Sequence, residues 1–179
     1  IIDLRNNPGG LLNESVDIVN LFVDKGEEIV STKGKIKSWD KKYIARNEPL
    51  DKQIPLVVLI NSASASASEI VSGSLQDLDR GIVIGQRSFG KGLVQQTRKL
   101  SYNSQLKLTV AKYYIPSGRC IQALDYSNRN EDGSVGKLPD SLATEFNTRS
   151  GRKVYDGGGF NPDIIFKKEK LDNIVVSLF

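Results

Sequence analysis

The chain of 179 residues contains no histidine, and this absence excludes several familiar hydrolase sites. Ser-His-Asp triads, Cys-His pairs and zinc sites of the HExxH kind all need an imidazole. A hydrolase built from this chain alone must therefore use another base, and no metal or cofactor is expected. The remaining groups that can act near neutral pH are a buried lysine and a carboxyl group whose surroundings raise its pKa.

Cysteine and long apolar runs are scarce as well. The single cysteine, Cys120, cannot form a disulfide bond within the chain. The longest apolar stretch, residues 54–60, is far shorter than the roughly 20 residues that span a bilayer, so no membrane-spanning segment is expected. The net charge of +4 comes from 25 basic and 21 acidic residues that are scattered along the chain. This weak balance does not indicate a nucleic-acid partner.

The composition is that of an ordinary globular domain. Hydrophobic residues make up 39% and charged residues 26% of the chain, which fits one compact domain with its own core. The chain contains no methionine, and residues 1–4 are typical of the middle of a strand rather than of a signal sequence. We therefore expect a fragment of a longer protein.

Apolar β-branched runs alternate with patterns of helical period, and this order predicts an α/β fold. The run at 55–60 predicts a strand that is covered on both faces of its sheet. The segment 102–104 predicts the turn of a β-hairpin. Strands are expected at 1–5, 28–32, 36–45, 55–60, 81–85, 93–100 and 106–115. Helices are expected at 14–24, with Asn13 as the cap, after residue 66, and at 171–179.

Residues 125–159 differ in composition from the rest, because they are rich in Asn, Asp, Gly, Ser, Arg and Lys. A polar segment of this length within a compact domain is typical of a surface insertion. We expect a short helix inside it near 140–146. The chain is then expected to return to the sheet at 160–166.

An alternating serine-alanine segment, residues 61–69, joins the strand at 55–60 to the helical pattern that follows. Ser66 lies at this junction, where a serine can be exposed on a sharp turn near the positive end of the helix dipole. The same residues fit the S-x-x-E capping box, in which the serine only caps the helix. The pattern leaves both interpretations open. It also does not choose among the four serines Ser62, Ser64, Ser66 and Ser68.

A lysine between two glycines, Lys91, follows the strand expected at 81–85. A lysine amine accepts a proton only in its neutral form, and burial favours that form because it disfavours the charged ammonium. As a base, Lys91 is therefore expected to be buried; the alternative is an exposed lysine in a turn. The loop at 6–10 is a third element. Its glycine N–H groups could stabilise an oxyanion, and the alternative is a simple turn.

The three segments together resemble the carboxyl-terminal processing, or tail-specific, proteases. The motifs that carry the resemblance are D-L-R-N-N-P-G-G at 3–10, S-A-S-A-S-E at 64–69, F-G-K-G at 89–92 with Gln95, Y-I-P-S-G-R at 114–119 and N-P-D-I at 161–164. They cover nearly the whole chain outside the polar insertion. The resemblance implies the α/β spiral core that this family shares with the ClpP and crotonase group.

The resemblance also implies the roles of individual residues. The family's nucleophile corresponds to Ser66, its general base to Lys91, and the residue that orients the lysine to Gln95. The oxyanion hole corresponds to the N–H groups of Ala67 and Gly10. The implied activity is that of a serine endopeptidase that cleaves protein or peptide substrates, typically near their C-termini, through an acyl-enzyme.

Members of the family usually carry a PDZ domain and further core strands before this region, and both are expected to be absent from this chain. The insertion at about 125–159 is longer than in simpler members. The resemblance further implies a location in the bacterial cell envelope, in the periplasm, and is compatible with a homo-oligomer. A catalytically silent binding or scaffold module is the alternative function. An acyl-CoA enzyme of the crotonase kind would leave the set of Ser66, Lys91 and Gln95 unexplained.

Overall fold

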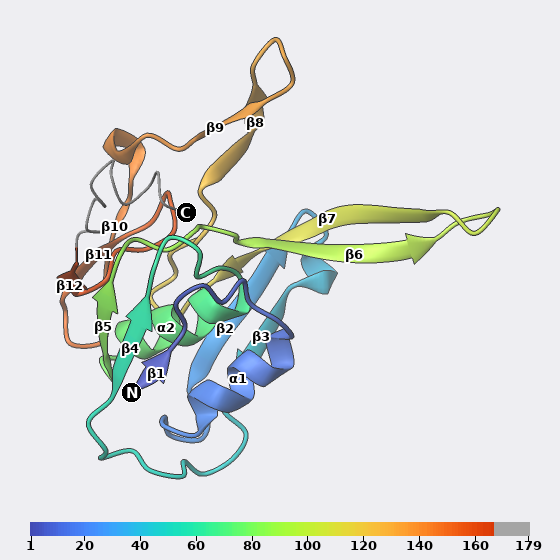
Figure 1. Ribbon diagram of the computed structural model, residues 1–179. Helices are drawn as coiled ribbons and strands as arrows, with labels where there is room; N and C mark the ends of the chain where they lie inside the picture. The colour runs from blue at the N-terminus through green and yellow to red at the C-terminus, as the bar shows by residue number, and fades with distance from the viewer. Residues whose placement is uncertain (167–179) are drawn as a thin grey trace, which may run out of the picture.

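The computed structural model describes residues 1–166, and one of its two main sheets is a four-stranded parallel sheet on one side of the molecule (Figure 1). The strand order is β1-β4-β5-β12, and each neighbouring pair is parallel. The strands are β1 (Ile2–Asp3), β4 (Val57–Ile60), β5 (Ile82–Gly85) and β12 (Ile164–Ile165). The α/β fold and the return of the chain to the sheet near 160–166 are therefore confirmed.

The helix α2 (Ala67–Asp77) packs against this sheet, and α1 (Leu12–Asn20) packs against α2. Every residue of α2 is buried, so this helix lies at the centre of the molecule. Its small residues allow close packing, because a Cβ atom at Gly73 would lie 2.8 Å from the Ile115 side chain. Buried hydroxyl groups find backbone acceptors: Ser74 Oγ, for example, donates to the Ile29 carbonyl at 2.8 Å.

A second, antiparallel sheet has the strand order β3-β2-β7-β6. Its strands are β2 (Glu28–Gly34), β3 (Lys41–Ile44), β6 (Leu93–Lys99) and β7 (Gln105–Tyr114). β6 and β7 form a long hairpin that projects from the body of the molecule (Figure 1). Tyr102 and Asn103 both have positive φ angles, of 59° and 56°, as a tight hairpin turn requires. The expected hairpin is therefore confirmed.

The polar segment after β7 forms two small hairpins outside the main sheets. They are β8 (Leu124–Arg129) with β9 (Val135–Lys137), and β10 (Glu145–Asn147) with β11 (Lys153–Tyr155). The short helix expected near 140–146 is a single 3₁₀ turn, Asp140–Leu142, and the next residues form β10. Another 3₁₀ turn, Lys37–Trp39, interrupts the strand expected at 36–45.

Two further expectations were wrong. The cap of α1 is Leu11 and not Asn13, because the helix begins at Leu12 and takes Asn13 into its first turn. The parallel sheet is not covered on both faces: Val58 and Ile60 are buried, whereas Ile82 on the neighbouring strand is 49% exposed. The helix expected at 171–179 lies outside the described residues. None of the helices in residues 1–166 is long and apolar enough to cross a membrane.

Candidate active site

Ser66 lies between β4 and α2, in an unusual backbone conformation. Its φ and ψ angles are 57° and −118°. An ordinary N-cap residue has extended angles, and this region is adopted readily only by glycine. The capping box that the S-x-x-E spacing predicts is formed, with Ser66 as the N-cap residue and Glu69 at its third position. Capping alone does not require the strained angles, which are typical of the sharp turn that exposes a nucleophile.

Glu69 connects the turn at Ser66 to the loop that carries Lys91. Its carboxylate accepts four hydrogen bonds, from the N–H groups of Ser66, Gly90 and Lys91 and from the hydroxyl of Ser88, at distances of 2.6 to 2.8 Å. The side chain is completely buried. One carboxylate therefore binds the backbone of both Ser66 and Lys91, the two residues that the family resemblance implies as a dyad. This wider role of Glu69 was missed in the sequence, where the S-x-x-E spacing indicated only a helix cap.

The electrostatic state of Glu69 reflects two opposing influences. Burial raises the pKa of Glu69 because it disfavours the charged carboxylate. The hydrogen bonds from Ser88 and from the three backbone N–H groups act in the other direction, and the net pKa remains above the ordinary value of 4.5.

The loop 88–92 is packed tightly against residues 121–123 and 159. Gly90 has a φ of +87°, and a Cβ atom there would lie 2.3 Å from the Ala123 side chain. A Cβ atom at Gly92 would lie 2.6 Å from the Gln122 nitrogen. Glycines on both sides of Lys91 are therefore a packing requirement.

The side chain of Lys91 is exposed, which contradicts the expected burial. The physical reason is that Lys91 precedes β6, an edge strand whose outer part projects from the molecule. Within residues 1–166 no hydrogen bond joins Lys91 to the hydroxyl of Ser66. Gln95, on β6, is exposed as well, and it lines the same pocket of about 270 Å³ as Lys91.

The loop at 6–10 lies directly against the Ser66 turn. Gly9 has a φ of +95°, and a Cβ atom there would lie 2.6 Å from the Ala65 oxygen and 2.7 Å from the Ala67 nitrogen. The Asn7 carbonyl accepts the Ala65 N–H at 3.0 Å. Among the described residues, the N–H groups of Gly10 and Ala67 donate to no protein acceptor. The Ala67 N–H directly follows Ser66, and Gly10 follows the glycine that contacts the Ser66 turn, so both are candidate donors to an oxyanion.

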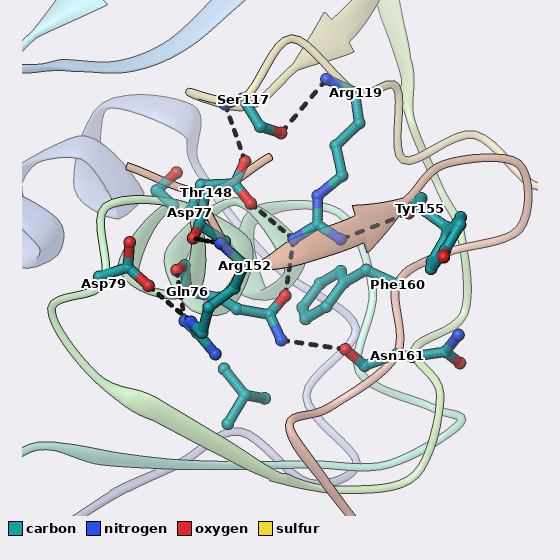
Figure 2. A network of polar contacts seen from close by, with 12 residues as sticks. Gln76, Asp77, Asp79, Ser117, Arg119, Thr148, Arg152, Tyr155, Phe160 and Asn161 are labelled. Carbon is teal, nitrogen blue, oxygen red and sulfur yellow. Dashed lines mark hydrogen bonds and ion pairs between the residues drawn. The ribbon is translucent and has the colours of Figure 1, made fainter. Parts of the chain in front are cut away.

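A buried polar network fixes the other end of α2 (Figure 2). Arg119 donates to Asp77 at 2.7 Å and to Gln76 at 2.6 Å, and its guanidinium lies 5.5 Å from the centre of the Phe160 ring. The Ser117 N–H donates to the second oxygen of Asp77. The P-S-G-R motif is therefore a structural anchor for the helix that begins after Ser66.

The N-P-D motif joins the same network. Gln76 donates to the Asn161 carbonyl at 3.0 Å (Figure 2). It also donates to Asp163 at 3.0 Å. Asp163 also accepts a hydrogen bond from the Val83 N–H and forms an ion pair with Arg152. The network thus connects α2, β5 and the polar segment. Sequence reasoning used both motifs only for the resemblance and assigned them no structural role.

No group of three or more potential metal ligands occurs within residues 1–166. Ser66 itself has strained backbone angles. The groups around it are two N–H donors, the buried Glu69 carboxylate and Lys91, whose backbone N–H donates to that carboxylate. These groups suit acyl transfer, in which a nucleophile attacks a carbonyl and N–H groups stabilise the oxyanion.

Comparison with known proteins points in the same direction. A carboxy-terminal-processing protease of Bartonella bacilliformis is 48% identical over 124 residues, which are 69% of this chain and 28% of that protein. A Staphylococcus epidermidis protein described as a CtpA-like serine protease is 44% identical over 124 residues, 68% of this chain and 25% of that protein. This chain thus spans less than a third of either relative's length.

A solved structure, that of a photosystem II D1 C-terminal processing protease, superimposes with a TM-score of 0.66. The superposition has 32% sequence identity and covers 92% of this chain and 33% of that one. The family model for peptidase family S41 matches residues 1–127, which include all the residues of the candidate site. The chain belongs to peptidase family S41.

Proposed function

We propose that this chain carries the catalytic groups of a serine endopeptidase that cleaves protein substrates near their C-termini through a Ser66–Lys91 dyad. The observation that carries the proposal is the Glu69 carboxylate, which accepts the N–H groups of both Ser66 and Lys91 at 2.8 Å. A helix cap alone would need the first of these bonds but not the second. Family membership and the names of the relatives support the reaction class.

The proposed reaction has two stages. Neutral Lys91 takes the proton of Ser66 Oγ while that oxygen forms a bond to the substrate carbonyl carbon. The N–H groups of Ala67 and Gly10 stabilise the oxyanion. The C–N bond then breaks, and the Lys91 ammonium returns its proton to the leaving amine. In the second stage a water molecule gives a proton to Lys91 while its oxygen attacks the acyl carbon. The bond from that carbon to Ser66 Oγ then breaks, and the Lys91 ammonium returns its proton to Oγ, which restores Ser66 and releases the new C-terminal carboxylic acid.

Gln95 is the residue that orients Lys91 in this proposal. The two side chains line one pocket, so the Gln95 amide can hold the lysine Nζ once a substrate is bound. We also propose, from the family resemblance, that the protein containing this chain has a PDZ domain and works in the cell envelope of a bacterium.

One observation favours a second candidate, a catalytically silent binding module: Lys91 is exposed and makes no hydrogen bond to Ser66 within the described residues. A fluorophosphonate probe distinguishes the two candidates, because it labels only an activated serine. For the protein that contains this chain we expect one labelled peptide, with the adduct on Ser66. The Ser66→Ala and Lys91→Ala variants should not be labelled. Labelling that is absent, or equal in the parent and Lys91→Ala, would favour the silent module.

A further inference from the structure

A larger cleft adjoins the pocket that holds Lys91 and Gln95. Its volume is about 990 Å³, and its walls come from β2, β6, β7 and β8. The two cavities share part of their lining, including Leu93, Gln95 and Tyr126, and therefore lie next to each other. A polypeptide bound beside Lys91 would thus lie next to the larger cleft.

The walls of this cleft carry more positive than negative charge. The positively charged residues are Lys33, Lys35, Lys37, Lys112 and Arg129, and the carboxylates are Asp125 and Asp156. Lys33, Lys35 and Lys37 come from one short segment, and the fold brings Lys112 and Arg129 to them from distant parts of the sequence. The net charge of the whole chain, only +4, gives no indication of this concentration.

Three of the lysines remain without a partner of opposite charge. Within residues 1–166, Lys33, Lys35 and Lys112 form no ion pair with a carboxylate, whereas Lys37 pairs with Asp40. Lys33 instead lies over the Tyr114 ring, 4.9 Å from its centre. A cleft with walls of one sign concentrates the field and attracts ligands of the opposite charge.

We propose that this cleft selects substrate segments that carry carboxylates, which bind Lys33, Lys35 and Lys112 while the scissile bond lies at Ser66. The inference rests on the proposed function and specifies its substrate class. The carboxylates have two sources, Asp and Glu side chains or the substrate's own C-terminus. A lysine ammonium is a compact charge with three hydrogen-bond donors, and it can bind a carboxylate from either source.

The test uses fluorogenic peptides of one length and the protein that contains this chain. One peptide carries two Glu residues next to the cleavable bond, and a second carries two Gln residues at the same positions. A further pair carries the Glu or Gln residues on the other side of that bond. Each is prepared with a free and an amidated C-terminus, which separates the two sources of carboxylate. At low salt we expect kcat/KM to be roughly tenfold higher for the Glu peptide than for the Gln peptide, or for the free acid than for the amide. Most of this difference should lie in KM.

The Lys33→Gln, Lys35→Gln and Lys112→Gln triple variant should remove this preference, so that the acidic and neutral peptides give equal kcat/KM. The matched control is the Lys25→Gln, Lys41→Gln and Lys52→Gln triple variant, which loses the same charge outside the cleft. It should keep the preference. Added salt should lower the preference of the parent, because these lysines are exposed.

A binding arm keeps this inference distinguishable from the proposed function. Ser66→Ala protein is titrated with the same labelled peptides, and their anisotropy is measured. Equal affinity for all peptides, or an unchanged preference in the cleft variant, would overturn the inference even if the parent cleaves every peptide. Selective binding of acidic peptides without any cleavage by the parent would instead overturn the proposed function and leave the cleft assigned.

Discussion

The candidate site has two sides, the turn at Ser66 and the loop that carries Lys91, and the fold restrains the first more than the second. Ser66 begins a completely buried helix whose far end is bound by the Arg119 network. Lys91 is bound only through its backbone, to Glu69, and its side chain is exposed beside a projecting hairpin. The core therefore pre-organises the proposed nucleophile, whereas the position of the proposed base depends on what occupies the pocket around it. Four experiments test this contrast.

Removal of either member of the dyad should have the largest effect. We expect Ser66→Ala and Lys91→Ala each to lower kcat for peptide hydrolysis by about 10³-fold or more, because both groups act in one step. Lys91→Arg should be equally inactive, since a guanidinium does not give up its proton. Circular dichroism should show an unchanged fold in all three. Turnover near the parental level in any of them would refute the dyad.

The network at the far end of α2 should carry the largest effect on stability. Asp77→Ala leaves the Arg119 guanidinium without its ion pair, and both side chains are at most 2% exposed. Breaking a buried pair in this way costs about 3–5 kcal/mol. Chemical denaturation should show this loss. Lys52→Ala removes an exposed ion pair to Asp24 and serves as the control, with little expected change. A small loss for Asp77→Ala would show that α2 does not depend on this anchor.

Glu69→Gln tests the connection between the two sides. A glutamine cannot accept all four hydrogen bonds, so we expect kcat to fall by about 10- to 100-fold as Ser66 and Lys91 lose their common acceptor. The stability difference should depend on pH. Because burial raises the pKa of Glu69 above 4.5, the folded state holds the proton more tightly than the unfolded state.

The sign of that dependence follows directly. The stabilisation from the Glu69 proton is present below pH 4.5 and is lost as pH rises through the folded-state pKa. The unfolding free energy of the parent, relative to Glu69→Gln, should therefore fall as pH rises above 4.5. Urea titrations at several pH values measure it. A difference that grows over this range would mean that hydrogen bonding, rather than burial, dominates the ionisation of Glu69.

The smallest effect is expected at Gln95, because it acts through Lys91. Gln95→Ala should lower kcat several-fold and leave stability unchanged, since the side chain is exposed. Gln96→Ala, at the next position of β6 and outside both pockets, is the matched control. A defect confined to KM, or one of equal size in both variants, would remove Gln95 from the positioning of the lysine.

The sequence predicted the parts of this structure that depend on local patterns. The apolar runs identified β4, β5 and the β6–β7 hairpin, and the S-x-x-E spacing placed the start of α2 at Ser66. The resemblance to the carboxyl-terminal processing proteases identified the family correctly. The residue roles that it implied, and the extent of the insertion, remain predictions.

Non-local interactions could not be predicted in the same way. The burial of Glu69 and its bonds to residues 88–91 depend on how two loops meet, and no spacing in the sequence encodes that distance. The exposure of Lys91 likewise follows from the edge position of β6 in its sheet. Flanking glycines indicated close backbone packing correctly, but they gave no information on the direction of the side chain between them.

The positive φ of Ser66 serves the proposed function but is expected to lower the stability of the fold. A glycine at this position would relieve the backbone strain, which costs about 1 kcal/mol or more, and would lose only a few tenths as a helix cap. Selection for thermal stability alone should therefore favour Ser66→Gly, a change that removes the proposed nucleophile. Directed evolution for heat resistance without an activity screen is thus expected to convert this chain into an inactive, more stable relative.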